Sequence, residues 1–429
     1  MEQKVKIKKH NKEENLEQFT KEELISKIKS LTAHNIQLKN LLAKQTSPEK
    51  IAKQSKAFDF SNTFFRYQFQ HVFLHLLYLG WDYKGFVVQE DTTDTVEHHL
   101  FEALMKTKLI QDRTSSNYHR CGRTDKGVSS FGQVISIDLR TNMLKNDQKE
   151  LLEDSNKSKN QLNYCKILNK VLPSNIQCVG WSLVGESSSA RFDCLSRTYK
   201  YYFPKGKLNI QKMRFASEKL LGTHDFRNLC KMDVGNGVVD FKRNITEMKI
   251  EPIDKQQNLY AMYVITIKAK AFLWHQIRCI MGILFLMGQE NEEPEVIDEL
   301  FNIEKYPRKP EYSMGSEIPL NLHYCEYENL NWNYDTQILD EITEKLNHFW
   351  TFYAVKKEMV RDMIKAIENI KISKKLPVVE TKCLSEHLVQ HLKTKNYVPL
   401  LKRQTCDSLE DKIEHYMKRK RIELIDENK

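Results

Sequence analysis

The stretch at residues 119–130 reads HRCGRTDKGVSS and ends where an alternating pattern of apolar and polar residues begins. That pattern, at residues 135–139, is typical of a half-buried β-strand. Within the stretch, Gly122 and Gly127 bracket an Arg-Thr-Asp-Lys segment, and glycines permit tight turns and the close approach of a ligand. We therefore expect a polar loop that leads directly into a core strand.

Working outward from this loop, strand and helix patterns occur in two cycles. The first cycle has a strand at residues 72–79 and a helix at 95–106. The second cycle has strands at 176–181, 198–203, 247–250 and 263–268, and helices at 162–171, 211–221 and 274–287. This alternation predicts an α+β fold of two ferredoxin-like α/β units, joined through a mainly antiparallel sheet flanked by helices. No clear sequence repeat links the two units, so the duplication is inferred from the pattern alone.

The character of the chain changes on both sides of these cycles. Residues 1–55 are predicted to form a helical arm, because apolar residues follow the alternating steps of four and three of a coiled-coil seam. Its seam is short, so an intramolecular packing helix is an equal alternative. We assign residues 56–160 and 161–332 to the two catalytic α+β units. Residues 333–429 are assigned to a helical, basic extension, which has helical periodicity at Leu339, Ile342, Leu346, Phe349, Tyr353 and Met363.

Composition and charge narrow the class of protein. Of the 429 residues, 40% are hydrophobic and 29% are charged, which describes a soluble chain without a membrane span or an apolar signal segment. The formal net charge of +10 suits a polyanionic partner but does not establish one. The nine cysteines include no CxxC pair and no Cys/His cluster with zinc spacing. The sequence therefore predicts reduced thiols and no structural metal.

Within the polar loop, Asp125 is the candidate nucleophile. Neighbouring cations stabilise the charged form of a carboxylate, and Asp125 stands between Arg123 and Lys126 in the sequence. An ionised carboxylate can attack carbon, and the cationic neighbours can contact phosphates. A salt-bridged surface turn is the alternative that the loop chemistry alone leaves open.

The string GRTDKGVS closely resembles the signature loop of the TruA family of tRNA pseudouridine synthases. The resemblance implies that the catalytic aspartate is Asp125 and that Arg123 contacts RNA and assists base extrusion. Other stretches resemble family motifs in the expected order. These are residues 190–193 (ARFD), 197–201 (RTYKY), 222–226 (GTHDF) and 271–278 (AFLWHQIR). Within them, the active-site tyrosine corresponds to Tyr199, and the arginine that pairs with the catalytic carboxylate corresponds to Arg278.

The residues themselves agree with these implied roles. Arg278 lies in an apolar helix, where an unpaired guanidinium is costly, so an anion must meet it: Asp125, or in its place another internal carboxylate or a helix C-terminal carbonyl. Tyr199 and Tyr201 share one face of a strand; we assign Tyr199 to the flipped base, by stacking or in proton removal, and Tyr201 to the core. The remaining candidates for substrate binding are Lys126, Arg191 and Arg197.

The resemblance implies an enzyme that isomerises uridine to pseudouridine in tRNA, without a metal or redox cofactor. Around residues 78–90 and 272–279 it is greatest to the eukaryotic branch that acts at positions 38 and 39 of the anticodon arm. Two interpretations without catalysis also remain: an RNA-binding or RNA-folding protein on the same fold, and a coiled-coil scaffold. A different tRNA site for the same enzyme also stays open. The expected partner is tRNA rather than a membrane, a homodimer is left open, and the basic run at 418–421 fits residence in the nucleus, the cytoplasm or both.

Overall fold

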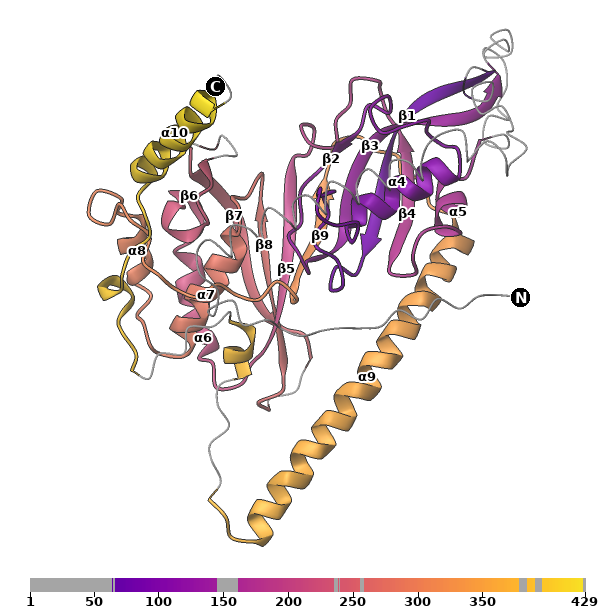
Figure 1. Ribbon diagram of the computed structural model, residues 1–429. Coiled ribbons are helices and arrows are strands. Elements are labelled where there is room, and N and C mark those ends of the chain that lie inside the picture. The colour runs from indigo at the N-terminus through magenta and orange to yellow at the C-terminus, as the bar shows by residue number, and fades with distance from the viewer. Residues whose placement is uncertain are drawn as a thin grey trace, which may run out of the picture. The chain divides into compact units, whose positions relative to one another are not determined.

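The computed structural model describes residues 64, 66–144, 161–234, 238, 240–254, 258–377, 384–389 and 396–426. The predicted arm at residues 1–55 lies outside this part of the chain. One compact unit, Tyr67–Lys429, is built on a single mixed sheet with helices packed against it (Figure 1). The strand order is β4-β1-β3-β9-β5-β8-β7-β6, with β2 added to β3. Most neighbours are antiparallel, as the sequence predicts.

The first half of the sheet consists of β1 (Tyr67–Tyr78), β2 (His119–Arg120), β3 (Ser129–Leu144) and β4 (Ile176–Leu183). Strand β1 is its centre, paired antiparallel with both β3 and β4. The helices α4 (Val96–Lys106) and α5 (Tyr164–Asn169) belong to this half, and each begins at a side-chain cap, Thr95 and Asn163. Their apolar faces and β1 share one hydrophobic cluster.

The second half is the larger hydrophobic unit. It contains β5 (Ser196–Pro204), β6 (Gly222–Asp225), β7 (Lys242–Pro252) and β8 (Met262–Ala269). Its helices are α6 (Ile210–Glu218), α7 (Gln276–Gly288) and α8 (Val296–Phe301). All its neighbouring strands are antiparallel. Helix α7 is buried along almost its whole length, so it forms the centre of this half.

Strand β9 (Leu320–Glu326) joins the two halves, and the sequence analysis did not identify it. It pairs in parallel with β3 and antiparallel with β5. The Ser130 hydroxyl donates a hydrogen bond to the Leu322 carbonyl (2.8 Å). At Gly132, a Cβ atom would lie 2.7 Å from the Tyr324 Cα, so the close approach of β9 requires glycine there.

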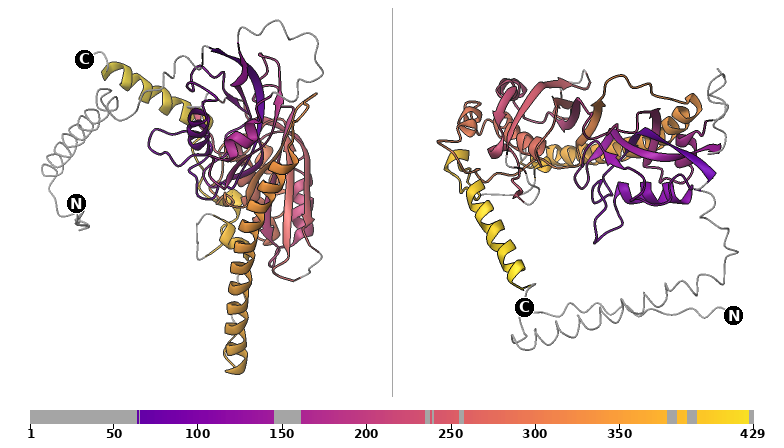
Figure 2. Two further views of the ribbon diagram at one scale, coloured as in Figure 1. Left: turned by 90° about the vertical axis from the view of Figure 1, so that its right-hand side faces the viewer. Right: turned by 90° about the horizontal axis from the view of Figure 1, so that it is seen from above.

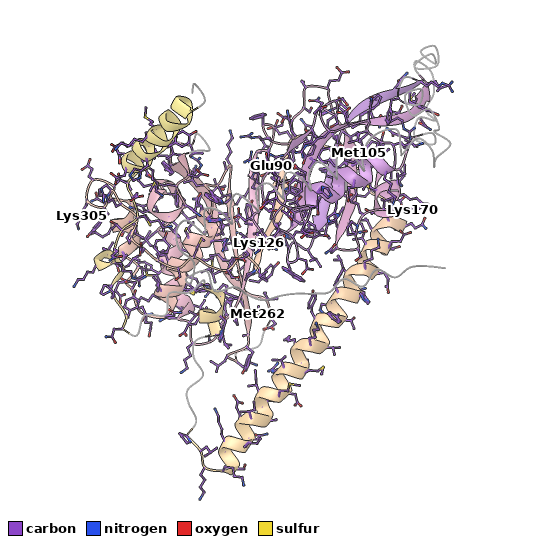
Figure 3. All side chains as sticks on the ribbon, in the orientation of Figure 1. Glu90, Met105, Lys126, Lys170, Met262 and Lys305 are labelled. Carbon is purple, nitrogen blue, oxygen red and sulfur yellow. The ribbon has the colours of Figure 1, made fainter. Side chains whose placement is uncertain are left out.

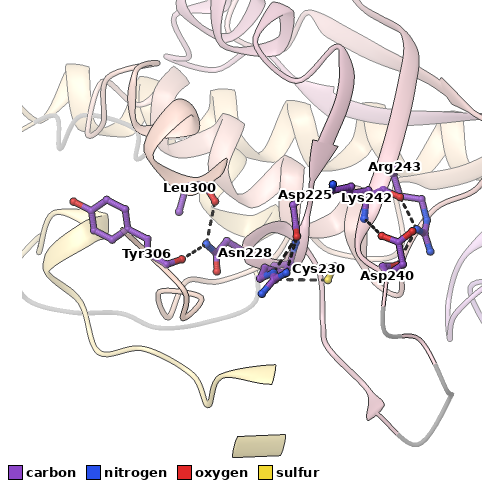
Figure 4. Close-up of polar contacts among 9 residues, drawn as sticks. Asp225, Asn228, Cys230, Asp240, Lys242, Arg243, Leu300 and Tyr306 are labelled. Carbon is purple, nitrogen blue, oxygen red and sulfur yellow. Dashed lines mark hydrogen bonds and ion pairs between the residues drawn. The ribbon is translucent and has the colours of Figure 1, made fainter. Parts of the chain in front are cut away.

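A short loop fastens the second half to the segment after α8. It contains the 3₁₀ helix η2 (Arg227–Leu229), in which the Asn228 amide donates to the carbonyls of Leu300 (3.0 Å) and Tyr306 (2.8 Å) (Figure 4). Asp225 accepts hydrogen bonds from Arg227. Residues 222–225 of the GTHDF segment form strand β6, and the hydrogen bonds of Asp225 hold the turn that follows this strand, so the segment has a structural role.

The C-terminal part is helical where it is described. Helix α9 (Thr336–Ser373) starts at the cap Asp335, and its first turns bury Ile338 and Ile342 against the first half of the sheet. Beyond these turns the helix extends past the sheet (Figure 2). The chain continues through η4 (Leu384–Leu388) and η5 (Leu400–Lys402) to α10 (Leu409–Asp426). Among the helices of the described residues, none has both the length and the apolar character of a membrane crossing.

Candidate active site

The Asp125 loop, defined here as residues 121–128, is held in place by backbone hydrogen bonds to a neighbouring turn. The amide of Gly127 donates to the Tyr83 carbonyl (3.1 Å), and the amide of Phe86 donates to the Thr124 carbonyl (3.1 Å). Gly127 has a φ of +78°, and a Cβ there would lie 2.7 Å from the Cγ of Glu317. Figure 3 labels Lys126, which marks the loop's place between the two halves. The predicted turn therefore exists and needs its second glycine.

The Asp125 carboxylate contacts two side chains that precede α7. The Trp274 indole nitrogen Nε1 lies 3.3 Å from Oδ1, and the His275 Nε2 lies 3.4 Å from Oδ2. Burial raises the pKa of Asp125, while the charges of Arg278 and Lys231 act in the opposite direction. The site thus places a partly desolvated carboxylate against one indole N–H donor and one imidazole nitrogen.

His275 has an unusual backbone and an unusual charge state. Its φ of +58° is in the left-handed region, which explains why α7 begins at Gln276 rather than at Trp274 as predicted. Burial, with the nearby cations Arg278 and Lys231, lowers the pKa of His275 to about 4. The ring is therefore neutral near pH 7. Its Nδ1 atom is buried and has no hydrogen-bond partner within the described residues, whereas its Nε2 atom faces Asp125.

Arg278 lies behind this pair and binds Glu317 directly. Its Nη2 atom is 2.8 Å from the Glu317 Oε2, and its Nε donates to the Gly315 carbonyl (2.8 Å). Only 5% of Arg278 is exposed. The direct partner is thus an internal carboxylate, one of the possibilities that the sequence left open. The guanidinium still lowers the pKa of Asp125 through space.

Sequence reasoning missed two charged residues of the site. The Lys231 ammonium lies 4.5 Å from the centre of the Trp274 ring, and the Lys231 amide donates to the Trp274 carbonyl (2.9 Å). Glu317 pairs with Arg278. Both lie about 40 residues from the motif that they support, so no local spacing could have identified them. By contrast, Trp274 and His275 lie within the AFLWHQIR motif, a few residues before Arg278.

Tyr199 lies on β5 and reaches the site through an aromatic neighbour. Its ring meets Phe272 edge to face, with centroids 5.3 Å apart, and Phe272 precedes Trp274 by two residues. Burial and the nearby thiols raise the pKa of Tyr199 well above its usual value, so its hydroxyl stays protonated. Tyr201 is completely buried in the core of the second half, as predicted.

The four cationic candidates for substrate binding separate into two kinds. Arg123, Lys126 and Arg191 are exposed, and each could meet a phosphate. Arg197 instead donates to three backbone carbonyls, those of Lys270 (2.5 Å), Cys121 (2.8 Å) and Arg191 (3.2 Å). It therefore joins the Asp125 loop to two other segments.

The cations that act on the Asp125 carboxylate are not the ones predicted from the sequence. The sequence predicts that Arg123 and Lys126 keep the carboxylate ionised, but both of these side chains extend into solvent. The cations that lower the pKa of Asp125 are Arg278 and Lys231, which are distant in sequence. The physical reason is that water screens the charges of exposed neighbours, whereas Arg278 acts through the buried interior.

Comparison with known proteins gives consistent matches. A family model described as tRNA pseudouridine synthase matches residues 216–328, a range that contains Arg278 and Glu317. A protein of Bos taurus named tRNA pseudouridine(38/39) synthase is 42% identical over 423 residues, covering 94% of this chain and 87% of that protein. Its namesake in Homo sapiens is 41% identical over 433 residues, with 94% and 89% covered. The protein of the same name in Saccharomyces cerevisiae is 39% identical over 297 residues, with 68% and 64% covered.

Proposed function

This chain belongs to the family of tRNA pseudouridine synthases, and from that premise we propose that Asp125 is the nucleophile with which it isomerises uridine in the anticodon arm of tRNA. The relatives' names assign positions 38 and 39, and we propose the same positions here. The observation that carries the proposal is the half-buried Asp125 carboxylate, which lies against the Trp274 and His275 ring nitrogens within the field of Arg278.

The reaction needs a group that bonds to carbon and leaves again. Pseudouridine formation breaks the bond between N1 of the base and C1′ of the ribose, and forms a bond between C5 and C1′. A carboxylate has two covalent routes, attack at C1′ with the uracil anion leaving, or addition at C6 of the base. In both, the proton on C5 is finally lost and the carboxylate is regenerated, so the product is an isomer of the substrate. Trp274 and His275 orient the carboxylate, and Arg278 favours its ionised form.

Tyr199 is proposed to support the flipped uracil ring. Extrusion of a base costs a few kcal/mol, which aromatic contacts and phosphate contacts can offset. The edge-to-face contact with Phe272 fixes the orientation of the Tyr199 ring. Since its hydroxyl stays protonated, Tyr199 is suited to stacking and to donating a hydrogen bond more than to removing the C5 proton.

The exposed cations are proposed to bind the RNA backbone. Arg123, Lys126 and Arg191 provide positive charge around the Asp125 loop, and Arg123 also assists extrusion of the base. Arg197 has a positioning role, because its guanidinium is held by carbonyls of three segments around the loop. Binding through several phosphates predicts an affinity for tRNA that falls steeply as salt rises.

The finer description of the architecture is also part of the proposal. We propose that the two halves of the sheet are ferredoxin-like units of common design, followed by the extension at 333–429. Because β4 pairs with β1, we place the bound between the units after β4 instead of at 160/161. Among the described residues, four antiparallel strands with two helices in the first half, and four antiparallel strands with three helices in the second, support this view. We also propose that the chain forms a homodimer and resides in the nucleus, the cytoplasm or both.

The test is a site-by-site measurement of pseudouridine in tRNA incubated with the purified chain and with its Asp125→Ala variant. We expect modification at positions 38 and 39, and a loss of at least about a thousandfold in rate without the carboxylate, with tRNA binding retained. Asp340→Ala, which removes an exposed aspartate of α9, is the matched control and should modify tRNA normally.

Each other outcome selects another hypothesis. Modification that survives in Asp125→Ala would remove Asp125 from the chemistry. Asp125-dependent modification at other positions would keep the enzyme and change its tRNA site. Tight binding of tRNA without any modification would favour an RNA-binding or RNA-folding protein on this fold.

A further inference from the structure

Three cysteines that are far apart in the sequence meet next to the Asp125 loop. Cys121 begins that loop, Cys194 precedes β5, and Cys325 lies on β9. The Cys121 Sγ atom lies 3.2 Å from the Cys325 Sγ and 3.5 Å from the Cys194 Sγ. All three sulfur atoms lie within 4.8 Å of one another, and each residue is at most 5% exposed. The structure therefore contains a compact, buried group of three thiols.

The dimensions of this group suit a metal ion. Zinc binds thiolates at about 2.3 Å, so three thiolates around one ion stand roughly 4 Å apart. The separations of Cys121 from Cys325 and from Cys194, 3.2 and 3.5 Å, are somewhat shorter than that value, and small outward rotations of these thiols would reach it. Soft thiolate ligands select zinc and copper(I) over the hard cations magnesium and calcium.

The surroundings supply charge and a fourth group. The Arg197 guanidinium, bound to the Cys121 carbonyl, interacts electrostatically with all three sulfur atoms. Three thiolates, one divalent cation and this guanidinium sum to neutral, which a monovalent ion would not achieve. The Tyr327 hydroxyl donates to the Ala190 carbonyl (2.6 Å) and also lies in contact with Cys121, so an oxygen is within reach of the fourth position of a tetrahedral ion.

We propose that Cys121, Cys194 and Cys325 form a structural zinc site that fastens the Asp125 loop to β5 and β9. Cys121 is four residues from Asp125, and its carbonyl and its thiol are both engaged, by Arg197 and by the other cysteines. Binding of Zn²⁺ replaces the thiol protons, which pass to solvent, so the affinity for zinc rises with pH. Sequence spacing could not reveal the site, because its members are separated by 73 and 131 residues.

The test measures metal rather than activity, so its failure is distinct from a failure of the proposed function. The full chain, purified under reducing conditions without a histidine tag, is passed through a chelating column and analysed for zinc by mass spectrometry. We expect about one zinc per chain. The apoprotein is then titrated with Co²⁺, which should give a thiolate-to-cobalt charge-transfer band with the intensity of three sulfur ligands.

Variants identify the ligands. Cys121→Ser and Cys325→Ser should lose the stoichiometric zinc and weaken the cobalt band, whereas the control Cys165→Ser should retain both. Cys165 is also buried, and its Sγ lies 3.2 Å from that of Cys178, so it matches the environment but belongs to a pair. If a variant does not fold, the cobalt titration of the wild-type chain still decides the matter. Absence of zinc together with absence of a thiolate–cobalt band would overturn the proposal, as would a disulfide between Cys121 and Cys325.

Discussion

The two halves of the sheet contribute different kinds of group to Asp125. The first half contributes the carboxylate, on a loop fixed by backbone hydrogen bonds and preceded by Arg120, which pairs with the fully buried Glu97 (2.8 Å). The second half contributes the electrostatic field, from Arg278 on the buried helix α7. The difference separates two tasks, since one half holds the nucleophile in place and the other sets its charge. Substitutions that weaken the support of the loop in the first half should therefore reduce stability alone, and those around Asp125 in the second half should reduce the chemical rate.

The largest effect is expected for Arg278→Met. It removes the buried cation nearest to the site and the ion pair between Arg278 and Glu317, which should cost about 3 kcal/mol of unfolding free energy. It should also lower the rate of pseudouridine formation by about 10² to 10³, because the Asp125 carboxylate loses its electrostatic support. Urea denaturation and single-turnover assays measure the two effects.

A second substitution separates these effects. In the double variant Arg278→Met/Glu317→Gln, the carboxylate that faced Arg278 is neutralised as well, so stability should recover while the rate stays low. Arg214→Met is the matched control in the same half. Within the described residues, the Arg214 side chain donates its hydrogen bond to the Ile250 carbonyl (3.0 Å), away from the site. Recovery of the rate along with stability would mean that Arg278 acts through folding alone.

The next effect, in the first half, is on stability. Glu97 accepts hydrogen bonds from Arg113 (2.9 Å), Arg120 (2.8 Å) and Tyr118 (2.8 Å), so Glu97→Ala should cost about 3–5 kcal/mol. The rate constant of the molecules that remain folded should be nearly unchanged. The control Glu102→Ala, on the exposed side of the same helix, should change neither the unfolding free energy nor the rate constant. A large fall in the single-turnover rate of folded Glu97→Ala would erase the contrast between the halves.

Trp274→Phe should have a smaller effect, confined to the rate. It keeps an aromatic ring but loses the N–H that lies 3.3 Å from Asp125, and a hydrogen bond to a charged group contributes about 1.5–3 kcal/mol. At this long distance we expect the lower end, a loss of roughly tenfold in single-turnover rate with unaltered tRNA binding. Trp350→Phe, on the exposed surface of α9, is the control. A loss of tRNA affinity without a change in rate would instead assign Trp274 to RNA binding.

The contrast between the halves also explains what could be foreseen from the sequence. Local patterns sufficed for β1, for α4 and for the loop around Asp125, because periodicity and glycine placement are encoded by near neighbours. They missed β9, the short strand whose pairing with both β3 and β5 is set entirely by tertiary contacts.

The charges of the site divide in the same way. A motif was enough to single out Asp125 and Arg278, but the pairing of Arg278 with Glu317 and the approach of Lys231 to Trp274 depend on the folded arrangement. The same holds for the pKa of Asp125, which is governed by burial and not by the cations adjacent in sequence. Residue identity is local information, whereas desolvation is a property of the whole fold.

The smallest expected effect is an increase in stability, whereas the substitutions above reduce stability or rate. Burial raises the pKa of Asp125 in the folded chain, so its contribution to stability is complete below the ordinary pKa of an aspartate and is lost as pH rises through the folded value. At pH 7 the ionised carboxylate therefore destabilises the fold, and Asp125→Asn, which keeps the shape without the charge, should increase the unfolding free energy by about 1 kcal/mol. Thermal unfolding at several pH values measures this.

The pH dependence makes the test specific. The advantage of Asp125→Asn should shrink as pH falls and the wild-type carboxylate becomes protonated. His275, whose pKa is lowered to about 4, stabilises the fold above its ordinary pKa and loses that contribution as the pH falls toward 4; both proteins share this loss, so it largely cancels in the difference. A wild-type chain more stable than Asp125→Asn at pH 7 would mean that the field of Arg278 outweighs burial. The second half would then hold the nucleophile in place as well as set its charge.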